Sequence, residues 1–230
     1  MMLTLDIYKE RIDEIQLYFR AINQLYESQE TFDKKYEFHA DDFLKMLKAN
    51  ALLMVYNLVE STIMGGILEI YDQVKSSGHS YMNVREELKE IWFSYKFNQV
   101  YDKTAHYNSY QQKAREIING IINSEVIELD RKATNISGNL DAQKIREICK
   151  NHGIKYKVDE SCRGGVVLED VKNKRNYLAH GTISFVECGR DYSIEALISI
   201  KDETITFLDG ILFEMKKYYD EKHYLTPKVS

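Results

Sequence analysis

A short stretch in the last third of the chain, NKRNYLAHG (173–181), gathers residue types from which chemistry on an anion can be built. Arg175 supplies a guanidinium, which binds carboxylate or phosphate oxygens through parallel hydrogen bonds. His180 supplies an imidazole, the side chain that exchanges protons most readily near neutral pH. The same residues suit an ordinary helix end, because a histidine in the last turn followed by glycine is common capping chemistry. Which interpretation fits depends on the helices and loops that surround this stretch.

The helical projection of this stretch gives the arginine an unusual position. Arg175 falls within an apolar stripe, between Val171 and Ala179. An arginine there requires a carboxylate, a phosphate or a subunit boundary beside it. Asn176 and His180 are four positions apart and share a face. Arg175 and His180 are separated by about 140° and about 7.5 Å along the axis, so one helix does not easily direct both at one atom. Two copies of the helix that cross near a two-fold axis can bring an arginine and a histidine into one cleft.

The composition indicates one globular domain built from helices. The chain has 230 residues, 44% of them hydrophobic, and a net charge of −5. Its single proline, Pro227, lies near the end, and the absence of this helix breaker elsewhere favours an all-α fold. We find no internal repeat or linker, so residues 1–230 are expected to form a single domain.

Several other classes of protein are disfavoured. The three cysteines are odd in number and widely spaced, which argues against a disulfide scaffold or a metal site. The chain shows no signal peptide and no run of about 18 apolar residues, so we expect a cytoplasmic protein that does not span a membrane. Nucleotide-binding glycine loops, GxSxG and HExxH are absent. The sequence RGG (163–165) is too short for a phosphate loop and predicts a turn before a helix.

Apolar periodicity places the helices along the chain. An a/d stripe predicts a helix over 5–26 that packs on a neighbour within the chain or across a dimer. Residues 42–73 are apolar in nearly every direction, which predicts a central, buried helix. Residues 182–192 are β-prone and predict a loop or a short hairpin. The remaining helices are expected at 83–97, at 110–130, from Asn139 or Asp141 to a stop at Gly153, at 165–180, and at 193–222 with a possible break over 201–206.

Within the predicted central helix, Glu60 needs explaining. It lies in the same angular sector as Ala49, Leu53 and Tyr56. A carboxylate in a buried sector needs a partner, and Arg175 is the obvious candidate. The alternatives are that Glu60 pairs with another basic residue or reaches solvent.

Charge is unevenly distributed along this acidic chain. Between Lys144 and Arg175, nine basic residues stand against five acidic ones. A basic face of this kind permits binding of a small anion or a short RNA segment, although a solvated surface is the simpler explanation of the charge alone.

Several segments of the chain resemble a known protein family. RNYLAH (175–180) resembles the R-x4-6-H signature of the HEPN superfamily, in which a polar residue such as Asn176 commonly follows the arginine. The segments YNLVEST (56–62), SGNLD (137–141) and EMKKYYDEKHYL (214–225) are similar to a bacterial branch found in defence and toxin gene neighbourhoods. The resemblance implies an all-α, HEPN-like helical bundle with extra helices.

The resemblance implies a metal-independent endoribonuclease that uses no cofactor. An RNA 2′-hydroxyl would attack the adjacent phosphate, with His180 as general acid or base, Arg175 stabilising phosphoryl charge and Asn176 orienting the phosphate or imidazole. Lys172 and Lys174 are candidate RNA-binding cations. The site would be composite in a homodimer, and an antitoxin or companion defence protein is an expected partner.

Two alternatives remain open. Many members of the family are non-catalytic modules that bind a nucleotide or a protein, which this chain could do through the same groove. A helical interaction protein could instead use a tyrosine-rich surface containing Tyr101, Tyr107 and Tyr110. Some members carry a modifiable tyrosine two positions after the histidine. Here that position is Thr182, which puts this form of control in doubt.

Overall fold

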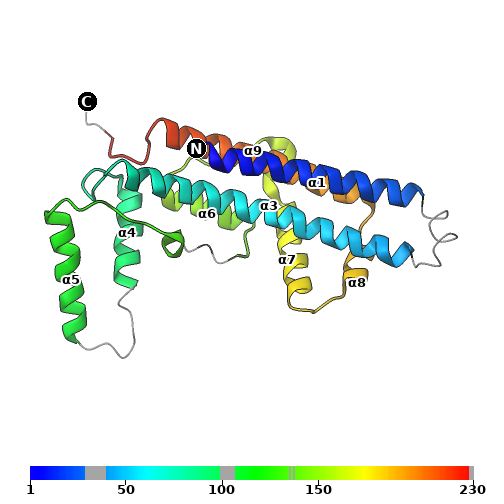
Figure 1. Ribbon diagram of the computed structural model, residues 1–230, viewed down its shortest axis with the longest axis horizontal. Helices are drawn as coiled ribbons and strands as arrows, with labels where there is room; N and C mark the ends of the chain where they lie inside the picture. Colours follow the sequence, from blue (N-terminus) through cyan, green and yellow to red (C-terminus); the bar gives the residue numbers. More distant parts are fainter. Residues whose placement is uncertain (29–39, 99–106, 135, 137, 228–230) are drawn as a thin grey trace.

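The protein, seen in a computed structural model, is a bundle of long helices along one axis, from which shorter helices project to one side (Figure 1). The structure describes residues 1–28, 40–98, 107–134, 136 and 138–227. In these ranges it has eight α-helices, two short 3-10 helices and no strand beyond isolated bridges, which confirms the all-α prediction. The elements are α1 (Leu3–Glu27), α3 (Ala40–Ser76), α4 (Glu86–Asn98), α5 (Tyr107–Ile122), η1 (Arg131–Thr134), α6 (Ala142–His152), η2 (Glu160–Gly165), α7 (Val167–Ala179), α8 (Phe185–Arg190) and α9 (Ile194–Asp220).

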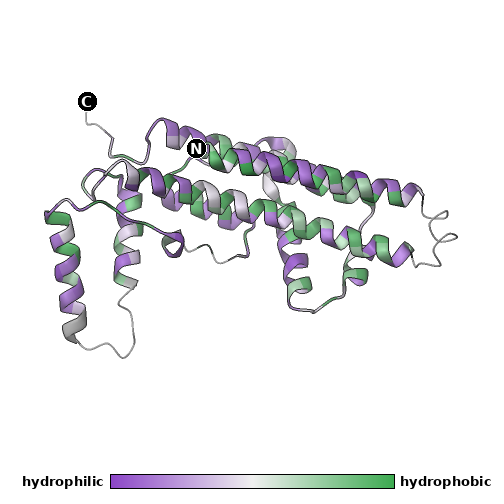
Figure 2. Ribbon diagram, in the orientation of Figure 1, coloured by the Kyte–Doolittle hydropathy of each residue, from purple (hydrophilic) through white to green (hydrophobic). Residues whose placement is uncertain are grey.

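Helix α3 is the centre of the fold, as its all-round apolar pattern predicts. It packs against α1, α7, α8 and α9, and side chains such as Leu52, Ile63 and Ile67 are completely buried. Helices α1, α3 and α9 run side by side along the molecule, and α1 presents its apolar stripe to α3 and α9 within the chain (Figures 1 and 2). The long bundle therefore forms the platform on which the shorter helices sit.

The packing of α3 explains why so long a helix is apolar. Among the described residues, α3 alone is long and apolar enough to cross a membrane by length and composition. Of its most apolar 18-residue window, 61% is buried inside the protein. A helix that is hydrophobic all round is required wherever neighbours surround it, and here the neighbours are helices of the same chain.

Local capping signals place the elements that precede the motif helix. The Asp141 side chain accepts a hydrogen bond from the Lys144 amide at 2.8 Å and begins α6, and Gly153 ends it with a φ of 68°. Asp141, one of the two predicted starts, is therefore confirmed, as is the stop. Residues 163–165 form a left-handed turn immediately before α7, as predicted for RGG.

Three local predictions differ from the structure. Residues 185–190 form helix α8 instead of a loop or hairpin, because Ser184 and Glu187 make a reciprocal capping box that starts a helix. That stabilisation outweighs the β-propensity of the segment. Helix α9 continues without a break over 201–206, where Thr204 is fully buried in the core. The helix expected over 110–130 ends at Ile122.

Helix α8 crosses the central helix at very short range. A Cβ atom added at Gly189 would lie 1.8 Å from the carbonyl oxygen of Lys45 on α3. Only glycine permits this backbone contact, which anchors the chain just beyond the motif helix.

Candidate functional site

The motif helix α7 ends in a glycine cap that fixes the place of the histidine. His180 is the last residue before Gly181, which has a φ of 68°. The Thr182 amide donates to the Tyr177 carbonyl at 2.8 Å, and the Gly181 amide donates to Leu178 at 3.2 Å, the pattern of a Schellman motif. The end of α7 points away from the long helices (Figure 1). His180 is therefore the capping residue of α7, and its side chain is exposed at the tip of the helix.

Arg175 lies in the seam between α7 and α3, as its position in an apolar stripe predicts. Its guanidinium lies over the ring of the buried Tyr56, 4.7 Å from the ring centre. Glu60, one turn further along α3, places Oε2 3.7 Å from Nη2, so the predicted ion pair is present. Nη1 donates to Asn176 at 2.9 Å. About a third of the Arg175 side chain, 31%, stays exposed, so a ligand can reach the anchored cation.

A loop residue completes this cluster and was missed by the sequence analysis. The Asn176 amide donates to Asn139 at 2.5 Å. Gly138 and Asn139 both have positive φ, 76° and 59°, which turns the loop toward α7. The Leu140 amide in turn donates to the Tyr56 hydroxyl at 3.2 Å. The Gly-Asn pair within SGNLD is the signal that could have identified this turn.

The two charged residues of the motif do not act on one point within a single chain. Arg175 faces α3, whereas His180 is exposed beyond it, and the helical rotation between them is about 140°. The His180 imidazole makes no hydrogen bond or ion pair to any residue that the structure describes. The imidazole is therefore available to an external group.

The two lysines of the motif helix are engaged inside the chain. Lys172 binds Asp141 at 2.6 Å, and Lys174 binds Asp191 at 2.9 Å. Hydrogen bonding to Asp191 raises the pKa of Lys174. Each side chain is only 18% exposed. These contacts tie α7 to the start of α6 and the end of α8, and they hold the helix that carries Arg175 in place.

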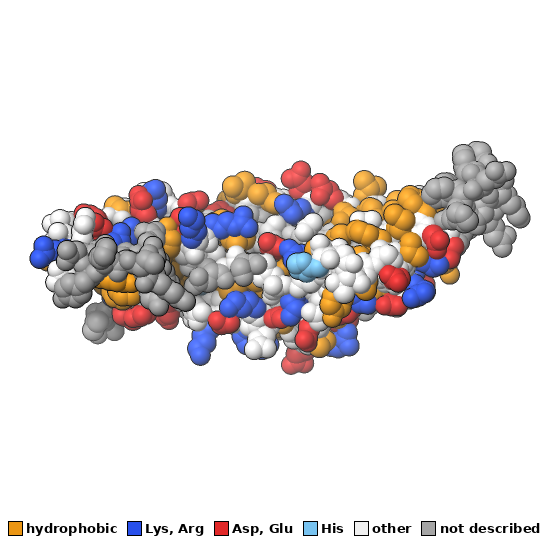
Figure 3. Space-filling view, turned by 90° about the horizontal axis from the view of Figure 1, so that it is seen from below, with side chains coloured by type: hydrophobic (Ala, Val, Ile, Leu, Met, Phe, Trp, Pro, Cys, Tyr) orange, Lys and Arg blue, Asp and Glu red, His pale blue; other side chains and the backbone are white. Residues whose placement is uncertain are grey.

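The face on which α7 and α8 project carries mixed charge. Basic and acidic side chains alternate over it, with hydrophobic groups toward one end (Figure 3). In the described part of the chain, no three His, Cys, Asp or Glu side chains are grouped so that they could hold a metal ion. Of the tyrosines considered for a binding surface, Tyr101 lies outside the described residues, and Tyr107 and Tyr110 lie in the first turn of α5.

Comparison with known families agrees with this architecture. The family model described as "HEPN_MAE_28990:/-like HEPN" matches residues 5–224, nearly the whole chain. Neither a curated protein nor a solved structure matches. The matched region includes the central helix, the Gly-Asn loop and the complete motif helix. The chain belongs to the HEPN family.

Proposed function

We propose that this protein is a metal-independent endoribonuclease whose active site forms between two copies of α7. The 2′-hydroxyl of RNA attacks the adjacent phosphate, the bond to the 5′-oxygen of the next nucleotide breaks, and a 2′,3′-cyclic phosphate and a 5′-hydroxyl result. His180 transfers a proton in this step as general base or acid. Arg175 stabilises the charge that develops on the phosphoryl oxygens, and Asn176 orients the phosphate.

The state of Arg175 is the observation that carries this proposal. Among the residues that the structure describes, one of the five N–H groups of its guanidinium donates, to Asn176, and the Glu60 carboxylate is beyond hydrogen-bond distance at 3.7 Å. Tyr56 and Glu60 hold the group in position without saturating its donors. A positioned cation with unused donors is what a transferring phosphoryl group requires.

The helix geometry supports the composite arrangement. Arg175 is held in the α3 seam and His180 lies at the exposed tip of the same helix. A second α7 across a two-fold axis supplies the missing group to each site, so each phosphate meets an arginine from one protomer and a histidine from the other. Lys172 and Lys174 orient α7 in this proposal, because both ammonium groups already have carboxylate partners.

The activity is tested by incubating the purified protein with total RNA in excess EDTA. We expect cleavage that leaves 2′,3′-cyclic phosphate ends, and its loss in Arg175→Ala and in His180→Ala with an unchanged melting temperature. Arg20→Ala, an exposed arginine on α1, is the matched control and should cleave as wild type. Chelator-sensitive cleavage, or active motif variants, would contradict the proposal. RNA binding without any cleavage would make the site a binding module instead.

The composite site has its own test, because two inactive variants can complement one another. Arg175→Ala retains His180, and His180→Ala retains Arg175. When the two are unfolded together and refolded, a mixed dimer contains one site with both groups. Recovery of cleavage is expected only for the mixture, and a mixture as inactive as its components would place both groups in one protomer.

The expected role in a cytoplasmic toxin or defence system, alongside an antitoxin or companion protein, is tested in cells. We expect that induction of the wild-type chain arrests growth, whereas His180→Ala at equal abundance does not. Equal toxicity of the two chains would separate any toxicity from the proposed nuclease.

A further inference from the structure

A second polar pocket lies away from the motif helix. It has a volume of about 380 Å³ and is formed where the start of α4, the end of α6 and the last turns of α9 meet. None of its lining residues belongs to α7. Its volume falls within the range of pockets that hold small ligands.

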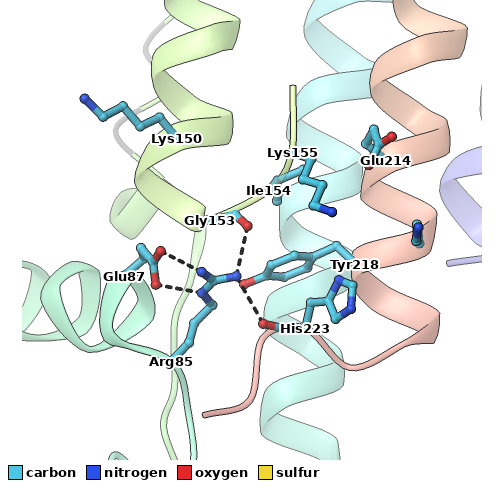
Figure 4. A pocket seen from close by; sticks show the side chains of 10 residues that line it. Arg85, Glu87, Lys150, Gly153, Ile154, Lys155, Glu214, Tyr218 and His223 are labelled. Carbon is cyan, nitrogen blue, oxygen red and sulfur yellow. Dashed lines mark hydrogen bonds and ion pairs between the residues drawn. The ribbon is translucent and has the colours of Figure 1, made fainter. Parts of the chain in front are cut away.

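One wall of this pocket is a closed structural cluster. The Arg85 guanidinium donates to both oxygens of Glu87, at 2.6 and 2.7 Å, and to the Gly153 and His223 carbonyls, at 2.9 and 3.3 Å (Figure 4). The hydrogen bond from Arg85 is the main cause that lowers the pKa of Glu87. The guanidinium also lies 5.8 Å from the centre of the Tyr218 ring. Arg85 is therefore neutralised and has little capacity for a ligand.

The opposite side of the pocket carries charged side chains that have no partner within the described chain. Lys155 and Lys217 form no ion pair with any carboxylate that the structure describes. Glu214 is buried to all but 8%, yet its carboxylate has neither a hydrogen bond nor an ion pair within the described chain. Its oxygens are not among the fully buried, unpartnered polar atoms of the described chain, so they open into the pocket, where a ligand can donate a hydrogen bond to them. Lys150 lies at the rim with its ammonium turned outward (Figure 4).

We propose that this pocket binds a small phosphorylated molecule that also carries hydroxyl groups, such as a sugar phosphate, free or within a nucleotide. Lys155 and Lys217 bind the phosphate, because two ammonium groups without counter-ions attract a multiply charged oxyanion. Glu214 accepts a hydrogen bond from a hydroxyl of the same ligand, because its oxygens open into the pocket and have no partner within the described chain. The proposal does not depend on the nuclease activity.

The test uses the full chain and three probes in thermal-shift and calorimetric titrations: ribose 5-phosphate, pyrophosphate and ribose. We expect the two phosphates to bind and to raise the melting temperature, and ribose alone to do neither. The double variant Lys155→Ala/Lys217→Ala should bind both phosphates at least roughly tenfold more weakly. Lys216→Ala is the matched control, because that lysine neighbours Lys217 but pairs with Asp220, and it should bind as wild type.

Glu214→Gln separates the two halves of the proposed site. Removing the carboxylate charge should strengthen pyrophosphate binding and reduce the preference for ribose 5-phosphate, because the hydroxyl loses a charged acceptor. Absence of phosphate binding by the wild type, or an equal loss in Lys216→Ala, would overturn the proposal. A third outcome would also overturn it: the small phosphates do not bind, and the double variant binds an RNA oligonucleotide more weakly than the wild type. The pocket would then bind the RNA backbone.

Discussion

Arg175 and Arg85 occupy similar surroundings in different parts of the molecule, and the contrast separates a structural arginine from one with free donors. Both lie beside a tyrosine ring and a glutamate, and their side chains are 31% and 25% exposed. Arg85 makes four hydrogen bonds within its chain. Within the described ranges Arg175 makes one, to its neighbour Asn176. The exposed fractions of the two arginine side chains are therefore similar, whereas the numbers of hydrogen bonds that they make differ.

The elements around each arginine explain this difference. Arg85 joins three segments, since its partners lie at the start of α4, just after α6 and after α9. Arg175 lies against α3, where Tyr56 and Glu60 orient it, and 31% of its side chain stays exposed. The first arrangement holds the fold together, and the second leaves a positioned cation at the protein surface.

Conservative replacement of each arginine by lysine gives the largest expected effects. Arg175→Lys keeps the charge but loses the planar donor set, so RNA cleavage should fall by about 10²–10³-fold with little change in stability. Arg85→Lys should do the opposite, lowering the free energy of unfolding by about 1–2 kcal/mol with cleavage retained. Cleavage rates and urea unfolding of both variants check the pair. Equal losses of cleavage in the two lysine variants would contradict the proposed difference between Arg175 and Arg85.

The Arg85 region also predicts a pH dependence of stability. His152 lies beside Gly153, is 3% exposed, and binds the Tyr71 hydroxyl at 2.7 Å. Burial lowers the pKa of His152 from 6.5 to about 4. Below pH 6.5 the unfolded chain binds the proton and the folded chain does not, so stability present above that pH is lost progressively toward pH 4. From pH 7.5 to 5 the loss should be about 2 kcal/mol.

Urea unfolding at several pH values between 7.5 and 5 measures this loss. In His152→Gln, which cannot take up the proton, the pH dependence over this range should largely disappear even if the variant is less stable throughout. A slope unchanged in His152→Gln would assign the effect to other groups.

The glycine that ends the motif helix predicts a smaller effect, and α3 supplies its control. Gly181 and Gly78 follow α7 and α3 with φ of 68° and 69°, and a Cβ at either would meet nothing within 4 Å. Replacement by alanine should therefore lower stability by about 1 kcal/mol in both. Only Gly181→Ala should also lower cleavage, by roughly tenfold, since it shifts His180 at the cap. Equal cleavage by the two variants would show that the position of His180 at the cap is unimportant.

Local signals explain how far the sequence could predict this fold. The Asp141 cap, the Gly153 stop and the RGG turn follow from the conformations that those residues favour, and the structure contains all three. Helix α8 was missed because its β-branched and aromatic residues outweighed a readable signal, the Ser184–Glu187 capping box. Propensity summed over so short a segment is weaker than a specific cap.

The candidate site likewise contains contacts that the sequence predicts and contacts that it does not. The contact of Arg175 with Glu60 could be predicted, because a cation and a carboxylate in two apolar helical faces each need a partner. The contribution of Asn139 could not, because it depends on how a loop with two left-handed residues meets a distant helix. The engagement of Lys172 and Lys174 was also hidden, since their partners lie 31 and 17 residues away.

The smallest expected effect concerns Glu60, and it tests whether Arg175 is positioned for a phosphate. At 3.7 Å, between side chains that are 24% and 31% exposed, this ion pair contributes little to stability. Glu60→Gln should leave urea unfolding within about 0.5 kcal/mol of wild type. It should lower kcat for cleavage by roughly fivefold, because the guanidinium is held less firmly, without raising KM, because a negative charge near the RNA is removed.

The matched control for Glu60 is Glu203, which binds the exposed Arg163 at 2.9 and 3.0 Å and pairs with no motif residue. Glu203→Gln should leave both kcat and KM unchanged. A merely structural role for Glu60 predicts that its variant behaves like Glu203→Gln once stability is matched. A selective fall in kcat therefore requires that the carboxylate acts through Arg175 on the reacting phosphate, whereas unchanged kcat would leave Arg175 positioned by Tyr56 and Asn176 alone.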